Sequence, residues 1–254
     1  MKNLLKQLLK EDILGILPWL FIPLIGVFSG LYLNDITGIG GFDMIAFISV
    51  GVLFMGPLIA LVILVGNDHN RFYGKYAALY DTYPLSSGKI TFTRLLNYVI
   101  LGMFIILIYI FNILLVVPDN IGFIEFFREV INLLGQLSAD QYFEMFKILL
   151  TFIGLGLMLA LTFMAANSIG NSYYFKKLGK LGPVLVGVVL FAVENYIQIK
   201  MIANYSADKI IVENSNITLS FFETNYILVG IFILELVVLY LATNYFHKKA
   251  LSVA

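Results

Sequence analysis

The sequence predicts an all-α membrane protein with six transmembrane helices and with both termini in the cytoplasm. Three observations predict this class. Of the 254 residues, 60% are hydrophobic and only 13% are charged, which is too few charges to cover a soluble domain of this length. Six apolar runs are long enough to cross a bilayer, which takes about 20 residues of helix. Basic residues collect on alternate connections between those runs.

The predicted spans cover residues 13–33, 44–66, 95–118, 146–170, 181–200 and 224–246. Residues 1–12 carry leucines and lysines at helical spacing, which predicts an amphipathic helix in the headgroup plane or else the cytoplasmic start of the first span. The outer loops 119–137 and 201–223 are expected to have helical parts. Ser138 and Gln141 fit a capping box that opens the helix of the fourth span. All these segments are expected to form one transmembrane domain, residues 1–254.

The distribution of charge sets the predicted orientation, because Lys and Arg in short loops mark the cytoplasmic side. With the N-terminus inside, the outer segments hold ten of the sixteen acids, and the cytoplasmic segments hold twelve of the sixteen basic residues: Lys2, Lys6, Lys10, Arg71, Lys75, Lys89, Arg94, Lys176, Lys177, Lys180, Lys248 and Lys249. The chain has no cysteine, which excludes disulfides, thiolate metal sites and cysteine nucleophiles.

The most polar internal segment lies between the second and third spans. Residues 70–84 predict an amphipathic helix at the cytoplasmic surface, with Asn70 as its N-cap and Pro84 after its end. Its aromatic stripe and flanking residues are Phe72, Tyr76, Tyr80 and Tyr83, with Tyr73 and Leu79 beside them and Arg71 and Lys75 at the edges. Two interpretations stay open: aromatic rings resting in the headgroup layer, or a docking ridge for a soluble partner.

Two acids lie inside predicted spans. Glu235 is near the middle of the last span, where a carboxylate is unfavourable by roughly 2.5–3.5 kcal/mol and is functional by default. The structural alternative is a hydrogen bond to a polar neighbour: Asn167, Thr162 or Asn112. Glu194 falls toward the outer end of the fifth span, where an interfacial position is expected.

Enzyme chemistry is not expected within this chain. Neither histidine lies in a predicted span, and no HExxH, GxSxG or paired intramembrane aspartates occur. Seven residues separate Gly66 from Gly74, where a P-loop has four, so no nucleotide site is predicted. A proton-coupled secondary transporter that uses Glu235 and Glu194 is one function that these residues leave open.

The segment "GND…YGKYAALYDTYPLSSGKITFTRLLNYV" resembles the signature of the ABC-type-2 exporter permeases. In that family, a phrase of the type LP-[IV]-S-[RK]-x-x-[IVL] precedes a basic residue that begins the third span. Here the phrase is YPLSSGKI, residues 83–90, followed by Arg94, and Ser87 stands where the family commonly has a basic residue. In size and plan the chain is most similar to small permeases that export amphipathic peptides. The staphylococcal exporter of phenol-soluble modulins is one such system.

The resemblance implies that the helix over residues 70–84 is a coupling helix seated in a cleft of a separate ABC ATPase subunit. That subunit would bind ATP and Mg²⁺, and this chain would bind no metal or cofactor. The implied ATPase-contact residues are Arg71, Phe72, Tyr73, Lys75, Tyr76, Leu79, Tyr80 and Tyr83.

The resemblance also implies two permease copies around one pathway, expected to be a homodimer in a bacterial plasma membrane. Gly26 and Gly30 form a GxxxG step that would lie at the contact between copies, and packing within one subunit is the alternative. The implied cargo is an amphipathic antimicrobial or cytolytic peptide, with drugs and lipid-linked glycans as the alternatives. No nucleic-acid partner is expected.

Overall fold

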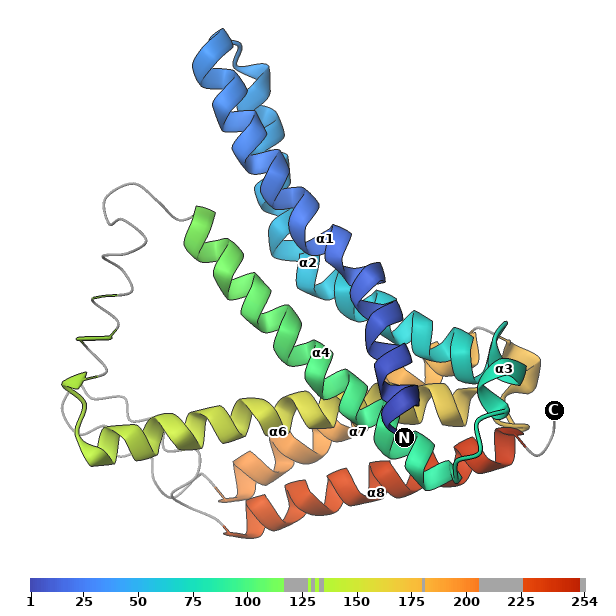
Figure 1. The fold of residues 1–254 in the computed structure, drawn as a ribbon. Helices are drawn as coiled ribbons and strands as arrows, with labels where there is room; N and C mark the ends of the chain where they lie inside the picture. Colours follow the sequence, from blue (N-terminus) through green and yellow to red (C-terminus); the bar gives the residue numbers. More distant parts are fainter. Residues whose placement is uncertain (117–127, 129–130, 133–134, 180, 206–225, 252–254) are drawn as a thin grey trace. The chain divides into compact units, whose positions relative to one another are not determined.

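The computed structural model describes residues 1–116, 128, 131–132, 135–179, 181–205 and 226–251, and its regular elements are all helices (Figure 1). In chain order they are α1 (Lys2–Thr37), α2 (Gly41–Phe72), α3 (Ala77–Asp81), α4 (Ser87–Val116), α6 (Ala139–Gly170), the 3-10 helix η1 (Lys176–Leu178), α7 (Leu181–Tyr205) and α8 (Tyr226–Leu251). The predicted all-α class is confirmed for this part of the chain. Most of the outer segments 119–137 and 201–223 lies outside the described residues.

Among the described residues, six helices are long and apolar enough to cross a membrane, namely α1, α2, α4, α6, α7 and α8. Large apolar side chains stand out from them, including Phe47, Val62 and Phe152, which are 79%, 68% and 68% exposed. Such side chains are stable in hydrocarbon and unfavourable in water. The six helices therefore indicate a multi-pass membrane protein.

Helix α1 is continuous from Lys2 to Thr37. Leu4, Leu8, Ile16 and Leu20 are buried at four-residue spacing, with the buried Asp12 between them. One face of the helix is thus covered by protein from its first turn onward. The separate headgroup helix expected over residues 1–12 is not formed, and the structure has the alternative, an early start of the first span.

The start of α6 was predicted correctly. The Ser138 N–H donates to Gln141 Oε1 at 2.8 Å, and the Gln141 N–H donates to Ser138 Oγ at 3.3 Å. These two bonds are the reciprocal pair of a capping box, which satisfies N–H groups that have no partner within the helix. The predicted cap is confirmed.

The contacts within the chain divide it into two compact units. The first comprises Met1–Asn70 and Leu96–Phe146, and the second comprises Arg71–Leu95 and Lys147–Ala254. The first unit thus holds α1, nearly all of α2 and most of α4. The second holds α3, the start of α4, most of α6, η1, α7 and α8.

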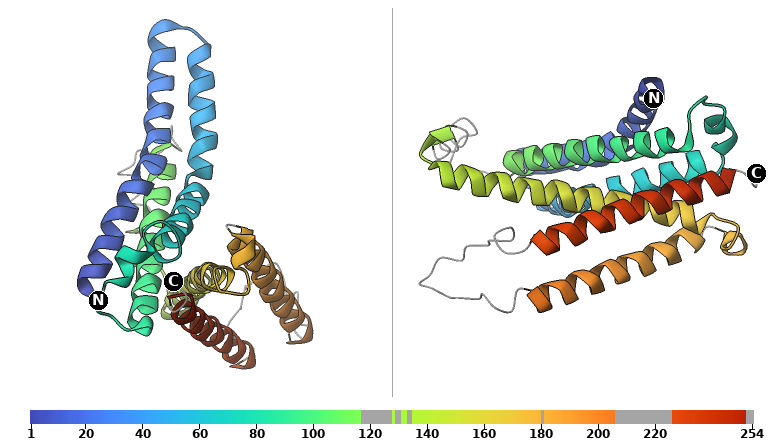
Figure 2. Two further views of the ribbon diagram at one scale, coloured as in Figure 1. Left: turned by 90° about the vertical axis from the view of Figure 1, so that its right-hand side faces the viewer. Right: turned by 90° about the horizontal axis from the view of Figure 1, so that it is seen from below.

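In the first unit, α1 and α2 pack against each other in opposite directions (Figures 1 and 2). A Cβ atom added at Gly30 would lie 2.7 Å from the backbone nitrogen of Ala46 and 2.8 Å from the carbonyl oxygen of Phe42. Gly26 likewise faces the side chain of Ser49. The GxxxG step therefore serves the close approach of α2 within the chain, the alternative to the dimer contact that the resemblance implied.

Substitution of Gly30 by valine is expected to lower the free energy of unfolding by at least about 1–3 kcal/mol, because the new side chain meets α2 backbone that cannot move aside. Gly51 is the matched control, since a Cβ there has no atom within 4 Å. Thermal unfolding in detergent measures both effects. Equal stability of the Gly30→Val and Gly51→Val variants would contradict this packing.

In the second unit, α6 and α7 form an antiparallel pair (Figure 2). Every fourth residue of α6 meets α7, which is one residue per helical turn. The paired residues are Gly170 with Gly182 and Pro183, Ala166 with Gly187, Thr162 with Glu194, and Met158 with Gln198. At the tightest point, a Cβ on either Gly170 or Gly182 would overlap the backbone of the opposite helix, so both positions require glycine.

Helix α8 packs on α6 and on the start of α4. Leu161 and Ala165 of α6 and Leu239 of α8 form a buried apolar core. Ser87 Oγ donates to Asn244 Oδ1 at 2.7 Å, and the Tyr240 hydroxyl donates to the Gly88 carbonyl at 3.3 Å. These contacts join α4, α6 and α8 near residues 87–95.

Candidate functional site

The connection between α2 and α4 differs from the single helix predicted over residues 70–84. Helix α2 continues to Phe72, a turn follows, and α3 has only five residues. Asn70 lies inside α2 and caps nothing, so its predicted role is wrong. Gly74 lies in the turn, and glycine disfavours helix by about 1 kcal/mol relative to alanine, which fits the break.

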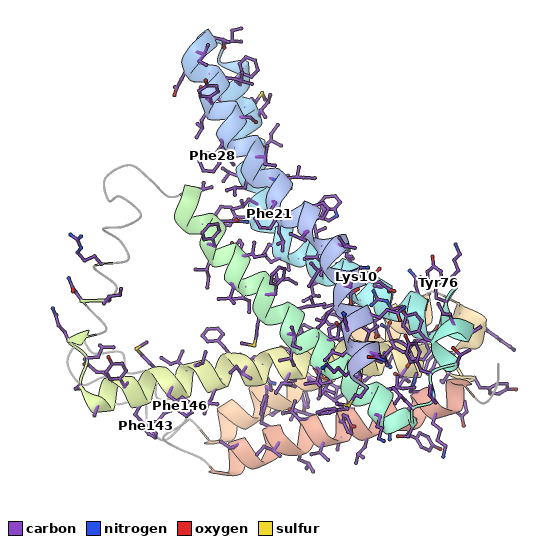
Figure 3. The ribbon with its side chains drawn as sticks, viewed as in Figure 1. Lys10, Phe21, Phe28, Tyr76, Phe143 and Phe146 are labelled. Carbon is purple, nitrogen blue, oxygen red and sulfur yellow. The ribbon has the colours of Figure 1, made fainter. Side chains whose placement is uncertain are left out.

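The eight predicted ATPase-contact residues do not form one exposed ridge. Phe72 and Tyr80 are 2% and 3% exposed, and Arg71 is also buried. Tyr73 and Tyr83 are half-buried. The exposed members are Lys75, Tyr76 and Leu79, and Figure 3 shows Tyr76 projecting from this connection. Of the eight, only these three are thus exposed for contact with a partner.

The hydroxyl of Tyr73 lies at the centre of a cluster that draws on three long helices. Arg94 Nη1 of α4 donates to it at 2.9 Å, Ser168 Oγ of α6 lies at 2.6 Å, and His247 Nδ1 of α8 lies at 2.9 Å. Arg94 is 1% exposed, and Ser168 and His247 are fully buried. We call these four residues the Tyr73 cluster.

The protons of the Tyr73 cluster can be assigned by counting donors. The Ser168 hydroxyl donates to the Met164 carbonyl at 2.8 Å, so its oxygen is left to accept the proton of Tyr73. The Tyr73 oxygen then accepts from Arg94 and from His247 Nδ1. A hydroxyl has one proton and two lone pairs, so this order satisfies these four bonds when Nδ1 carries the histidine proton.

Aromatic contacts extend the cluster to α3. The Arg94 guanidinium lies 4.7 Å from the ring centre of Phe72, and the His247 ring meets Phe72 edge-on at 5.8 Å. Tyr80 of α3 packs on Phe72 at 5.3 Å, and Tyr83 stacks on Tyr80 at 6.1 Å. A desolvated cation–π contact contributes up to about 2 kcal/mol. The α2–α4 connection is therefore fixed to α4, α6 and α8.

Sequence analysis did not find the Tyr73 cluster. The sequence could have pointed to Ser168 and His247, because both lie near the predicted cytoplasmic border, at the ends of the fourth and sixth spans. Arg94 was predicted only as a cytoplasmic basic residue and as part of the family phrase. The sequence could place these residues at one depth but could not show that they converge on one tyrosine.

The two intramembrane acids both lie in the second unit. Glu194 is only 9% exposed, and the Thr162 hydroxyl lies within 2.8 and 2.9 Å of its two carboxyl oxygens. Helix α6 therefore covers this side chain, and its expected interfacial depth stays a prediction. Glu235 is half-buried, and its Oε1 atom is enclosed without a hydrogen bond to the described residues.

Two of the three partners predicted for Glu235 are engaged elsewhere. Thr162 bonds to Glu194, and Asn112 Nδ2 donates to the Leu20 carbonyl at 2.8 Å. Neither Thr162 nor Asn112 therefore makes the structural hydrogen bond that was predicted for Glu235. The two acids therefore differ: the Glu194 carboxyl bonds to Thr162, whereas Oε1 of Glu235 has no hydrogen bond to the described residues.

Substitution of Thr162 by valine keeps the shape of the side chain and removes the only hydroxyl that bonds Glu194 in the described part of the chain. We expect a loss of about 1–3 kcal/mol in the free energy of unfolding, because the buried Glu194 carboxyl loses its hydrogen-bonding partner. The double variant Thr162→Val with Glu194→Met should recover most of that loss. A destabilisation that persists in the double variant would show that the Thr162 effect is unrelated to Glu194.

The first unit contains a second buried polar cluster, which sequence analysis also did not single out. Asp12 of α1 is fully buried, and its two carboxyl oxygens accept from Asn67 Nδ2 at 2.8 Å and from Asn97 Nδ2 at 2.7 Å. One acid thereby joins α1, α2 and α4. The three residues lie near the predicted cytoplasmic ends of the first three spans, and this shared depth could have suggested that they meet.

In the described part of the chain, no three His, Asp or Glu side chains are grouped so that they could hold a metal ion. Comparisons with protein families, curated proteins and solved structures gave no match. Function must therefore be argued from the chain itself. Its relevant features are the six apolar helices, the α2–α4 connection held by the Tyr73 cluster, and the acids Glu194 and Glu235 within predicted spans.

Proposed function

We propose that this chain is the membrane-spanning permease subunit of an ATP-driven exporter of the ABC type. The observation that carries the proposal is the α2–α4 connection, in which exposed Lys75, Tyr76 and Leu79 stand on a support that Tyr73 bonds to three long helices. A force applied to the exposed edge would reach α4, α6 and α8, because the buried contacts leave the connection little freedom to move alone. The resemblance around residues 83–90 favours an ABC ATPase as the source of that force.

The proposal divides the implied contact residues by role. Lys75, Tyr76 and Leu79 would contact the ATPase, and the Lys75 ammonium lies 5.4 Å from the Tyr76 ring centre, which places charge and ring together. Exposed aromatic residues beside a cation are favourable interface anchors. Phe72 and Tyr80 would instead act as the support, because both are buried.

The proposed assembly contains two permease copies and two ATPase subunits in a bacterial plasma membrane, with both termini of the permease in the cytoplasm. ATP and Mg²⁺ would bind to the ATPase subunits. Gly26 and Gly30 are not assigned to the contact between permeases, because α2 covers them. The proposed cargo is an amphipathic peptide, and drugs and lipid-linked glycans are the alternative cargoes.

A proton-coupled secondary transporter is the second candidate. It is favoured by the two carboxyl groups in one unit, with Glu194 buried on Thr162 and the enclosed Oε1 atom of Glu235. Intramembrane carboxyls of this kind carry protons in many transporters. This function would need no ATPase, which makes the two candidates separable.

The deciding experiment isolates the chain from native membranes in mild detergent and identifies the proteins that co-purify. We expect an ABC ATPase in equal amount, and its loss in the double variant Tyr76→Ala with Leu79→Ala. The matched control is Tyr142→Ala with Phe143→Ala, because Tyr142 is 47% exposed, as Tyr76 is, and belongs to α6 near its predicted outer end. Transport by the purified chain alone in liposomes with a proton gradient would reject the ABC assignment and favour the second candidate.

A further inference from the structure

The described residues of the connection between α6 and α7, residues 171–179, form successive turns that the proposed function does not use. Successive turn hydrogen bonds of 2.8–3.3 Å fix its backbone, running from Asn171 to Asn167, Ser172 to Ile169, Phe175 to Ser172, Leu178 to Phe175 and Gly182 to Gly179. Gly179 has a φ of 52°, which glycine adopts without strain, and it turns the chain into α7. The close contact of Gly170 with Gly182 holds the two ends together.

This fixed backbone displays two tyrosines and a lysine. Tyr173 and Tyr174 are 74% and 71% exposed and meet edge to face at 6.2 Å between ring centres. Lys177 and Leu178 are exposed beside them in the same short segment. Phe175 between them is half-buried. The segment thus turns one aromatic residue inward and leaves a pair of tyrosine rings with a cation outside.

The position of the segment limits what can cover it. One candidate span ends at Gly170 and the next begins at Leu181, so the intervening residues lie at a membrane border on whichever side they emerge. Tyrosine is favoured in the headgroup layer, where its ring is apolar and its hydroxyl is wet. A lysine at the same border is attracted to anionic lipids by roughly 1 kcal/mol, or about fivefold in affinity.

The charges of the neighbouring residues also favour contact with anionic lipids. Residues 145–193 contain no Asp or Glu, whereas residues 176 and 177 are both lysine. No acid along this stretch of sequence can neutralise the positive charge. The complementary partner is therefore an anionic one, and the nearest anionic surface at a membrane border is the phosphate layer of the lipids.

We propose that Tyr173, Tyr174 and Lys177 form a binding surface for the headgroups of anionic phospholipids. The Lys177 ammonium would donate to phosphate oxygens, and the tyrosine hydroxyls would donate to the same oxygens while their rings rest on the glycerol region. The surface holds the α6–α7 turn at a fixed depth in the membrane. It does not depend on the proposed transport function.

The test uses the cysteine-free full-length chain with a single cysteine at Leu178, labelled with a fluorophore and placed in lipid nanodiscs. Quenching is compared between spin-labelled phosphatidylglycerol and spin-labelled phosphatidylcholine at equal amounts. We expect stronger quenching by the anionic lipid, reduced toward equality by 0.5 M salt because salt screens exposed charges. The double variant Lys176→Gln with Lys177→Gln should lose the preference, and Tyr173→Ser with Tyr174→Ser should weaken quenching by both lipids.

The matched control is Lys2→Gln with Lys6→Gln, which removes the same charge from exposed positions of α1 and should keep the preference. Equal quenching by the two lipids in the unsubstituted chain would overturn the proposal. It would also be overturned if the probe were wet in nanodiscs but shielded in native membranes, because the occupant would then be a protein. Each variant is first checked for a monodisperse elution profile, so that misfolding is not mistaken for lost binding.

Discussion

Replacement of Asp12 by alanine is expected to lower the free energy of unfolding by about 3–5 kcal/mol, among the largest effects of any single substitution in this chain. The Asp12 carboxyl is fully buried and accepts from Asn67 and Asn97, so its removal leaves the buried amide of Asn97 and the half-buried amide of Asn67 without their acceptor. Each such group costs about 1–3 kcal/mol. Thermal unfolding in detergent should show a fall in Tm of roughly 10 °C for a chain of this size.

Two comparisons identify the cause of the Asp12 effect. Glu11→Ala removes an exposed acid from the adjacent position and should change stability by no more than about 0.5 kcal/mol. The triple variant Asp12→Leu, Asn67→Leu, Asn97→Leu replaces all three polar groups together and should recover much of the loss, because no amide is then left unpaired. A triple variant as unstable as Asp12→Ala would locate the effect in packing and not in the hydrogen bonds.

The long helices were predictable because the bilayer imposes a simple rule on the chain. Backbone groups in hydrocarbon must be paired within the helix, so an apolar run of sufficient length has essentially one stable form. The capping box at Ser138 and Gln141 was predictable for a similar reason, since its two bonds join residues three positions apart. Both features depend on local sequence alone.

The candidate site was only partly predictable because its contacts join distant parts of the chain. Tyr73 and His247 are 174 positions apart, and no local pattern pairs them. The same limit applies to the predicted aromatic ridge, where helical spacing suggested one exposed face but Phe72 and Tyr80 turned inward toward Arg94 and each other. At Gly26 and Gly30 the sequence predicted a close helix approach but left open whether the partner was a second copy or another helix of the same chain, and the structure shows that it is α2.

Replacement of Tyr73 by phenylalanine is expected to lower the free energy of unfolding by about 2–4 kcal/mol. The ring and its packing stay, but Arg94, Ser168 and His247 lose the oxygen that joins them. A bond to a buried charged group contributes about 1.5–3 kcal/mol, and the two remaining contacts add to it. Tyr76→Phe is the matched control, because it removes the same atom from an exposed ring three residues away and should have almost no effect.

The Tyr73 substitution also distinguishes two roles in the proposed exporter: anchoring of the α2–α4 connection to the spans, and contact with the ATPase. Lys75, Tyr76 and Leu79 are unchanged in Tyr73→Phe, so the ATPase should still co-purify. The coupling of ATP hydrolysis to transport should fall, because the hydroxyl that bonds the connection to Ser168 of α6 and His247 of α8 is gone. A double-mutant cycle of Tyr73→Phe with Ser168→Ala should give a coupling energy of about 1–2 kcal/mol, since the two oxygens lie 2.6 Å apart. Tyr73→Phe could instead be as stable and as well coupled as Tyr76→Phe. The Tyr73 cluster would then not transmit motion, and Lys75, Tyr76 and Leu79 alone would have to explain any effect of the ATPase on the spans.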